Sequence, residues 1–120
     1  MNDPAGRWRW APPALWAAAL MVTTSWPNPG VPQVGQADKL VHVLLYGVLA
    51  WLVGRAEPTL AVVRRRAVLT IVALACFAAL DEWHQGFVPG RAASRADWAA
   101  DVVGAAAGLT LITVGRRRAA

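Results

Sequence analysis

One short stretch after a long apolar run carries most of the acidic side chains in this chain. It reads LDEWHQGFVPGRAASRADWAAD, residues 80–101, and its charged or polar members are Asp81, Glu82, His84, Gln85, Arg91, Arg95, Asp97 and Asp101. Carboxylates and imidazoles are common general acids and bases, and guanidinium groups bind phosphate or carboxylate. These residue types therefore indicate either acid–base chemistry or recognition of an anionic group.

A second polar set lies earlier in the chain, in the stretch DKLVHVLLYGVL, residues 38–49. Asp38, His42 and Tyr46 follow one another at intervals of i, i+4 and i+8, so they share one helix face, and Lys39 lies beside them. Asp97 and Asp101 share a helix face in the same way. We expect both sets to contribute to one site.

Structural roles compete with functional ones for several of these residues. Asp38 is a candidate N-cap, and Ser94 with Asp97 has the spacing of a capping box. Arg91 and Arg95 could simply meet lipid phosphates, and His42 alone could be a packed histidine. Asp81 and Glu82 have no such role, because negative charge is disfavoured near a helix C-terminus. They are the stronger functional candidates.

Composition places the chain in the membrane class. Hydrophobic residues make up 57% and charged residues 16%, below the usual charged share of about 25% in soluble domains. The net charge of +5 comes from arginines that flank apolar segments, which fits lipid headgroups and argues against nucleic acid. The single cysteine, Cys76, is expected to be a buried apolar residue.

Apolar periodicity predicts an all-α fold, an integral membrane bundle of four transmembrane helices in a single domain, residues 1–120. The expected helices are 10–26, 38–54, 67–85 and 94–114, with a Pro- and Gly-rich linker at 27–37 and a basic linker at 55–66. No small-x-small cleavage site precedes Trp26, so we expect the first helix to be retained. A soluble helical bundle is the alternative, but these segments lack polar faces.

Arginine placement predicts the orientation of this bundle. One side collects Arg7, Arg9, Arg55, Arg64, Arg65, Arg66, Arg116, Arg117 and Arg118, and the other collects Lys39, Arg91 and Arg95. The positive-inside rule then places both termini in the cytoplasm and the polar residues at the extracytoplasmic face. The stretch GAAAG, residues 104–108, allows close helix packing, either within one chain or in a homo-oligomer through Gly104 and Gly108.

The combination of these motifs resembles the VanZ-like family of small multi-pass bacterial membrane proteins. The resemblance rests on residues 38–49 and on DEWHQGFVPGRAASRADWAADVVGAAAG, residues 81–108. It implies a plasma-membrane protein of the cell envelope whose founding member is associated with low-level resistance to the glycopeptide antibiotic teicoplanin. The motif positions that carry over are Asp38, Lys39, His42, Tyr46, Asp81, Glu82, Gln85, Arg91, Asp97 and Gly104, whereas Asp101 stands where the family often has asparagine.

Three functions fit this sequence. The first is binding or modulation of a cell-envelope lipid, a cell-wall precursor or a glycopeptide, with Lys39, Arg91 and Arg95 clamping an anionic group. The second is an intramembrane hydrolase or transferase in which His42 or Glu82 is the general base, oriented by Asp38 or Asp81. The third is a small transporter or proton relay.

We expect no metal and no other cofactor, because no H-E-x-x-H spacing is present. A Zn²⁺ or Mn²⁺ site made by His42, His84 and the carboxylates is the alternative.

Overall fold

The structure is a computed structural model that describes residues 4–27 and 36–120, and these residues form an all-helical fold without strands. The elements are α1 (Pro4–Trp8), α2 (Ala11–Thr24), α3 (Gln36–Ala56), α4 (Leu60–Gln85) and α5 (Arg95–Ala119). The all-α prediction is confirmed. Residues 28–35 of the predicted linker lie outside the described part of the chain.

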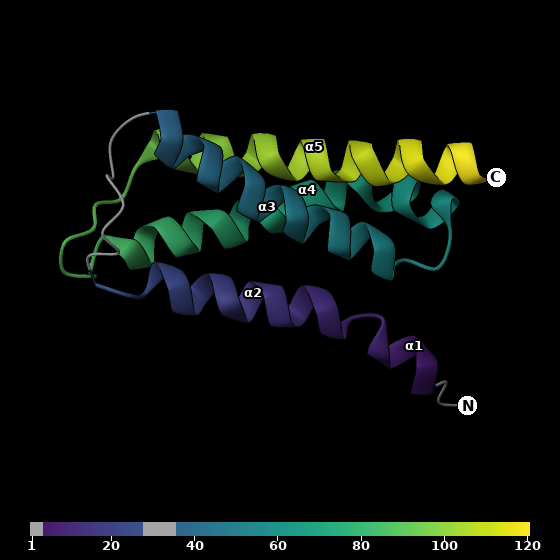
Figure 1. Ribbon diagram of the computed structural model, residues 1–120, viewed down its shortest axis with the longest axis horizontal. Coiled ribbons are helices and arrows are strands. Elements are labelled where there is room, and N and C mark those ends of the chain that lie inside the picture. Colours follow the sequence, from purple (N-terminus) through teal and green to yellow (C-terminus); the bar gives the residue numbers. More distant parts are fainter. Residues whose placement is uncertain (1–3, 28–35) are drawn as a thin grey trace.

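The four longer helices run up and down, so consecutive helices are antiparallel (Figure 1). The N- and C-termini lie at the same end of the bundle (Figure 1). At the opposite end the last turn of α2 meets the start of α3, the end of α4 and the start of α5. We call this opposite end, with Thr24, Asp38–His42, Asp81–Gln85 and Arg91–Asp101, the polar end. The other is the basic end, with Arg55–Arg66 and Arg116–Arg118.

Helices α3 and α5 pack most closely, because glycines remove side chains from their contact. A methyl group added at Gly104 would overlap the carbonyl oxygen of Val43, and one at Gly108 would overlap that of Gly47. Gly47 itself faces Gly104 across the same contact. The G-x-x-x-G stretch therefore serves packing within one chain, one of the two roles predicted for it.

Helix α4 begins earlier than the sequence predicted. Thr59 caps it by accepting a hydrogen bond from the backbone N–H of Val62 at 3.3 Å, and the helix starts at Leu60. The predicted basic linker is wrong over Arg64–Arg66, which occupy the second turn of the helix. A good N-cap and residues with high helix propensity outweigh the mutual repulsion of the arginines.

Helix α3 also begins earlier than predicted, at Gln36, so Asp38 lies inside its first turn instead of capping it. A carboxylate there still interacts favourably with the helix dipole. Helix α5 continues to Ala119, beyond the predicted end at residue 114 and through Arg116–Arg118. Basic residues in a last turn are favoured for the same electrostatic reason.

Apolar side chains cover much of the outer surface of the described helices. Leu44, Val68, Val103 and Leu111 are each more than half exposed, and Cys76 is exposed too, contrary to its predicted burial. Two helices are long and apolar enough to cross a membrane: Asp38–Ala56 within α3, and Arg95–Ala119, which is α5. Large exposed apolar surfaces mark contact with lipid or protein. Both observations favour a membrane protein.

Candidate functional site

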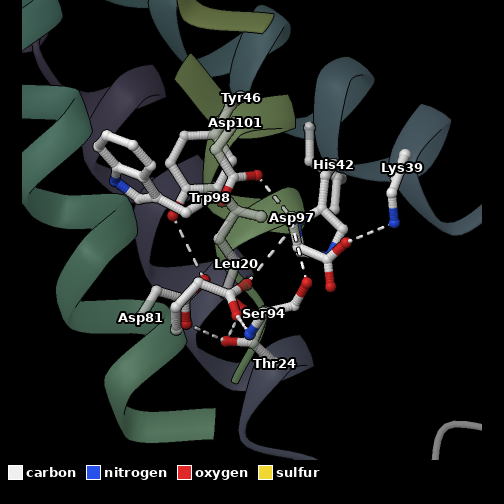
Figure 2. Close-up of polar contacts among 12 residues, drawn as sticks. Leu20, Thr24, Lys39, His42, Tyr46, Asp81, Ser94, Asp97, Trp98 and Asp101 are labelled. Atoms are coloured by element: carbon white, nitrogen blue, oxygen red, sulfur yellow. Dashed lines mark hydrogen bonds and ion pairs between the residues drawn. The ribbon is translucent and has the colours of Figure 1, made fainter. Parts of the chain in front are cut away.

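Asp81 is held by hydroxyl groups from two neighbouring helices. It lies near the end of α4, with 1% of its surface exposed. The hydroxyl of Thr24, from α2, donates to Asp81 Oδ1 at 2.7 Å, and the hydroxyl of Tyr46, from α3, donates to Oδ2 at 3.3 Å (Figure 2). A carboxylate is costly to bury without such partners. Asp81 thus joins α2, α3 and α4 at the polar end.

His42 and Asp101 form a close pair between α3 and α5. The distance from His42 Nδ1 to Asp101 Oδ1 is 2.8 Å (Figure 2). Glu82 Oε1, from α4, lies 4.0 Å from the same ring nitrogen. Asp101 is fully buried, and its Oδ2 has no hydrogen-bond partner among the residues that the structure describes. One imidazole therefore stands between two buried carboxyl groups.

Glu82 also takes part in capping the start of α5. Ser94 is the N-cap, and its hydroxyl accepts a hydrogen bond from the backbone N–H of Asp97 at 3.2 Å, as the capping-box spacing predicted. The reciprocal partner is different: the backbone N–H of Ser94 donates to Glu82 Oε2 at 2.9 Å. The Asp97 carboxylate is consequently free for another contact, an ion pair with Lys39 at 3.4 Å (Figure 2).

The three cations predicted to clamp an anion do not come together. Lys39 pairs with Asp97. The Arg91 guanidinium donates to the backbone carbonyls of Trp26 at 3.0 Å and Thr23 at 3.1 Å, so it caps the end of α2. Arg95 is exposed and lines a separate shallow pocket beside Trp98. Only Arg91 borders the cavity described next.

A cavity of about 110 Å³ lies at the polar end between α2, α3 and α4. Its polar lining comes from Thr23, Thr24, Asp38, His42, Tyr46, Asp81 and Arg91, and its apolar lining from Leu20, Val41 and Leu45. Liquid water occupies about 30 Å³ per molecule, so the cavity has room for a few waters or for one small charged group. Most of the predicted site residues border this cavity or lie directly behind it.

Gln85 connects Arg91 to Glu82. Its amide nitrogen donates to Glu82 Oε1 at 3.4 Å, and its amide oxygen accepts from Arg91 Nη1 at the same distance. These bonds join the cation that borders the cavity to the carboxylate beside His42. The Gln85 side chain thus links the edge of the cavity to the group around His42.

The contribution of α2 to the site was not predicted from the sequence. Thr24 binds Asp81, and Ser25 Oγ lies 3.0 Å from His84 Nε2. A signal was present, because Thr23, Thr24 and Ser25 end the first apolar segment, and an antiparallel bundle carries that end to the same face as Asp81. His84 is thereby directed to Ser25 and away from the His42 group.

Two overlapping groups at the polar end have the donor atoms for a metal ion. Asp38, His42 and Asp97 form one, and His42, Glu82 and Asp101 form the other, with the donor atoms of each group within 4.8 Å of one another. Each group combines residues from more than one helix, which explains why no local spacing motif revealed a complete ligand set.

Comparison with known proteins gives one match. The family model described as VanZ/LLP1 matches residues 8–116, which includes α2 to α4, all but the last residues of α5 and the described residues of the polar end. No curated protein and no solved structure matches the chain.

Proposed function

Because the chain belongs to the VanZ/LLP1 family, as the match over residues 8–116 shows, we propose that it is a bacterial plasma-membrane protein that binds the polar head group of an envelope lipid or a lipid-linked cell-wall precursor. The head group would enter the cavity at the polar end. The observation that carries this proposal is the convergence of polar residues from α2, α3, α4 and the loop before α5 around one small cavity.

The proposed topology has four spans with both termini in the cytoplasm. Support comes from the two apolar helices, the exposed apolar side chains and the common end of the termini (Figure 1). Arginines concentrate at that end, as the positive-inside rule requires of a cytoplasmic face. Helix α2 has 14 residues, about 21 Å at 1.5 Å per residue, so its span would need local thinning of the bilayer.

The volume of the cavity limits the size of the ligand that it can hold. The cavity of about 110 Å³ admits a phosphate or carboxylate with a few attached atoms, and a glycopeptide antibiotic is far larger. Arg91, which borders the cavity, supplies a cation for such a group. The rest of a lipid would stay outside, against apolar residues such as Val41. A lipid or precursor therefore fits better than a whole antibiotic.

A second function is favoured by the contact between His42 and Asp101. In a neutral imidazole whose Nδ1–H donates to Asp101 at 2.8 Å, Nε2 is the basic nitrogen. Since His42 borders the cavity, it could take a proton from water or a hydroxyl group there. The chain would then be an intramembrane hydrolase or transferase acting on the bound head group.

One experiment tests both functions. The full chain is reconstituted in nanodiscs containing phosphatidylglycerol, phosphatidylethanolamine or a polyprenyl phosphate, and its melting temperature is measured in each. We expect one head group to stabilise the protein, by about 2.7 kcal/mol at a hundredfold excess over its Kd. The Arg91→Gln variant should lose this difference between lipids, and Arg95→Gln should keep it.

Equal stability in all three lipids would contradict the binding proposal. The same nanodiscs are analysed by mass spectrometry for lipid whose head group has been removed or transferred. Turnover that disappears in His42→Gln would establish the second function, and stabilisation without turnover would establish binding alone.

A further inference from the structure

Three side chains at the polar end form a second group beside the head-group cavity, and of these only His42 also borders the cavity. His42 comes from α3, Glu82 from α4 and Asp101 from α5, and their donor atoms lie within 4.8 Å of one another. Glu82 is 5% exposed and Asp101 is completely buried. The group therefore unites three helices in a place shielded from solvent.

Asp101 gives an independent indication of a ligand. Its Oδ1 contacts His42, but its Oδ2 has no hydrogen-bond partner within the described residues. A buried acceptor left unsatisfied costs about 1–3 kcal/mol, and more when it is charged. The two oxygens of one carboxylate lie close together, so Oδ2 is beside the same group. A bound cation would satisfy it.

The charge balance points the same way. Asp81, Glu82, Asp97 and Asp101 are all buried at this end. The nearest ammonium group, that of Lys39, is 45% exposed and already pairs with Asp97. The Arg91 guanidinium is bonded to the Gln85 side chain and to the backbone carbonyls of Trp26 and Thr23. Negative charge therefore exceeds positive charge around Glu82 and Asp101.

We propose that His42, Glu82 and Asp101 bind a divalent transition-metal cation such as Zn²⁺ or Mn²⁺. One imidazole nitrogen with two carboxylate oxygens is a donor set that suits these ions. Tetrahedral Zn²⁺ with bonds of 2.0–2.2 Å holds its ligand atoms about 3.3 Å apart. The distances from His42 Nδ1 to Asp101 Oδ1 and to Glu82 Oε1, 2.8 Å and 4.0 Å, lie on either side of this value.

The surroundings of Glu82 fit this role. Its Oε2 is fixed by the backbone N–H of Ser94, and its Oε1 by the amide of Gln85. Such outer contacts orient metal ligands in proteins. Three protein ligands also leave one coordination position open, as in catalytic zinc sites. The proposal goes beyond head-group binding and does not depend on it, but an ion on His42 Nδ1 would replace the Nδ1–H bond to Asp101 on which the second function rests.

The overlapping group of Asp38, His42 and Asp97 is the weaker candidate. Asp97 already pairs with Lys39, and Asp38 is only half-buried. Neither residue was found to have an unpartnered buried oxygen within the described chain. This second group supplies the control for the experiment.

The test is a metal titration of the full-length protein in detergent after removal of metals with a chelator. Equilibrium dialysis with Zn²⁺ or Mn²⁺, followed by elemental analysis, should give about one tightly bound ion per chain. We expect Glu82→Gln and Asp101→Asn to weaken binding by more than about tenfold, since even outer-shell changes cost tenfold or more. Asp38→Asn and His84→Gln should retain it.

Cobalt provides a second, spectroscopic measurement that reports the coordination of the ion. Co²⁺ bound in a low-symmetry site absorbs visible light, and this band should appear in the wild-type protein and in His84→Gln but not in His42→Gln. Failure of the wild-type protein to bind either ion or cobalt would overturn the proposal. So would loss of binding in Asp38→Asn with binding retained in Glu82→Gln, which would assign the ion to the other group.

Discussion

Buried carboxylates have a complete set of partners at the basic end of the bundle and an incomplete set at the polar end. At the basic end Glu57, 6% exposed, accepts hydrogen bonds on both oxygens from Arg66 Nη1, each at 3.1 Å. Arg116 donates to the backbone carbonyls of Arg55 and Glu57 at 3.1 and 2.9 Å. At the polar end the buried acids exceed the cations, and Asp101 retains an oxygen without a partner among the described residues.

This difference distinguishes buried acids that stabilise the fold from buried acids that serve a binding site. A buried acid with a complete set of partners holds a turn in place, and the contacts around Glu57 do this for the turn between α3 and α4. A surplus of buried acid costs stability unless another group compensates it. Sites that bind ligands commonly contain such unfavourable arrangements, because the ligand completes them. The polar end is of this second kind.

Both ends depend on the close contact between α3 and α5, and breaking it should have the largest effect. Gly108→Ala would place a methyl group against the carbonyl of Gly47, so the helices must separate. Overpacking of this kind costs about 1–3 kcal/mol, which thermal unfolding in detergent should reveal. Gly115→Ala is the matched control, since a methyl group there meets nothing within 4 Å. Equal melting temperatures of the two variants would show that the contact does not limit stability.

Much of the polar end could be predicted from helical periodicity. The spacing of Asp38, His42 and Tyr46 placed them on one face, and the alternation of helices placed that face near Asp81 and Asp97. The capping role of Ser94 could also be predicted, because it depends only on residues within one turn.

The exact pairs between distant segments could not be predicted. Thr24 and Asp81 are 57 residues apart, and the antiparallel order of the helices brings them to one end without specifying that they bond to each other. Glu82 replaces Asp97 as the reciprocal partner of Ser94 because the path of the loop brings α4 to that N–H group. At the basic end, three consecutive arginines suggested a linker, but the cap at Thr59 and the acceptor at Glu57 allow a helix there.

Replacing one acid at each end by its amide should lower the stability of the protein only at the basic end. Glu57→Gln removes the charge that balances Arg66, whose side chain is 49% exposed, so the loss should be about 1–2 kcal/mol, between exposed and buried pairs. Asp101→Asn removes surplus charge and keeps an acceptor for His42, so stability should be unchanged or increased. Thermal unfolding is measured in chelator-treated detergent solution. A loss in Asp101→Asn as large as that in Glu57→Gln would remove the distinction between the ends.

The smallest effect should come from the arginines that follow one another at the end of α5. Arg116 donates to two backbone carbonyls, whereas Arg117 has no hydrogen bond to the described residues. Arg116→Gln should therefore lower stability by about 0.5–1.5 kcal/mol, the usual net value of a hydrogen bond, and Arg117→Gln should change it little. Both substitutions remove the same charge from the same end of the bundle. A difference in their melting temperatures thus measures the turn contact alone, and equal values would mean that the basic end acts only through its overall charge.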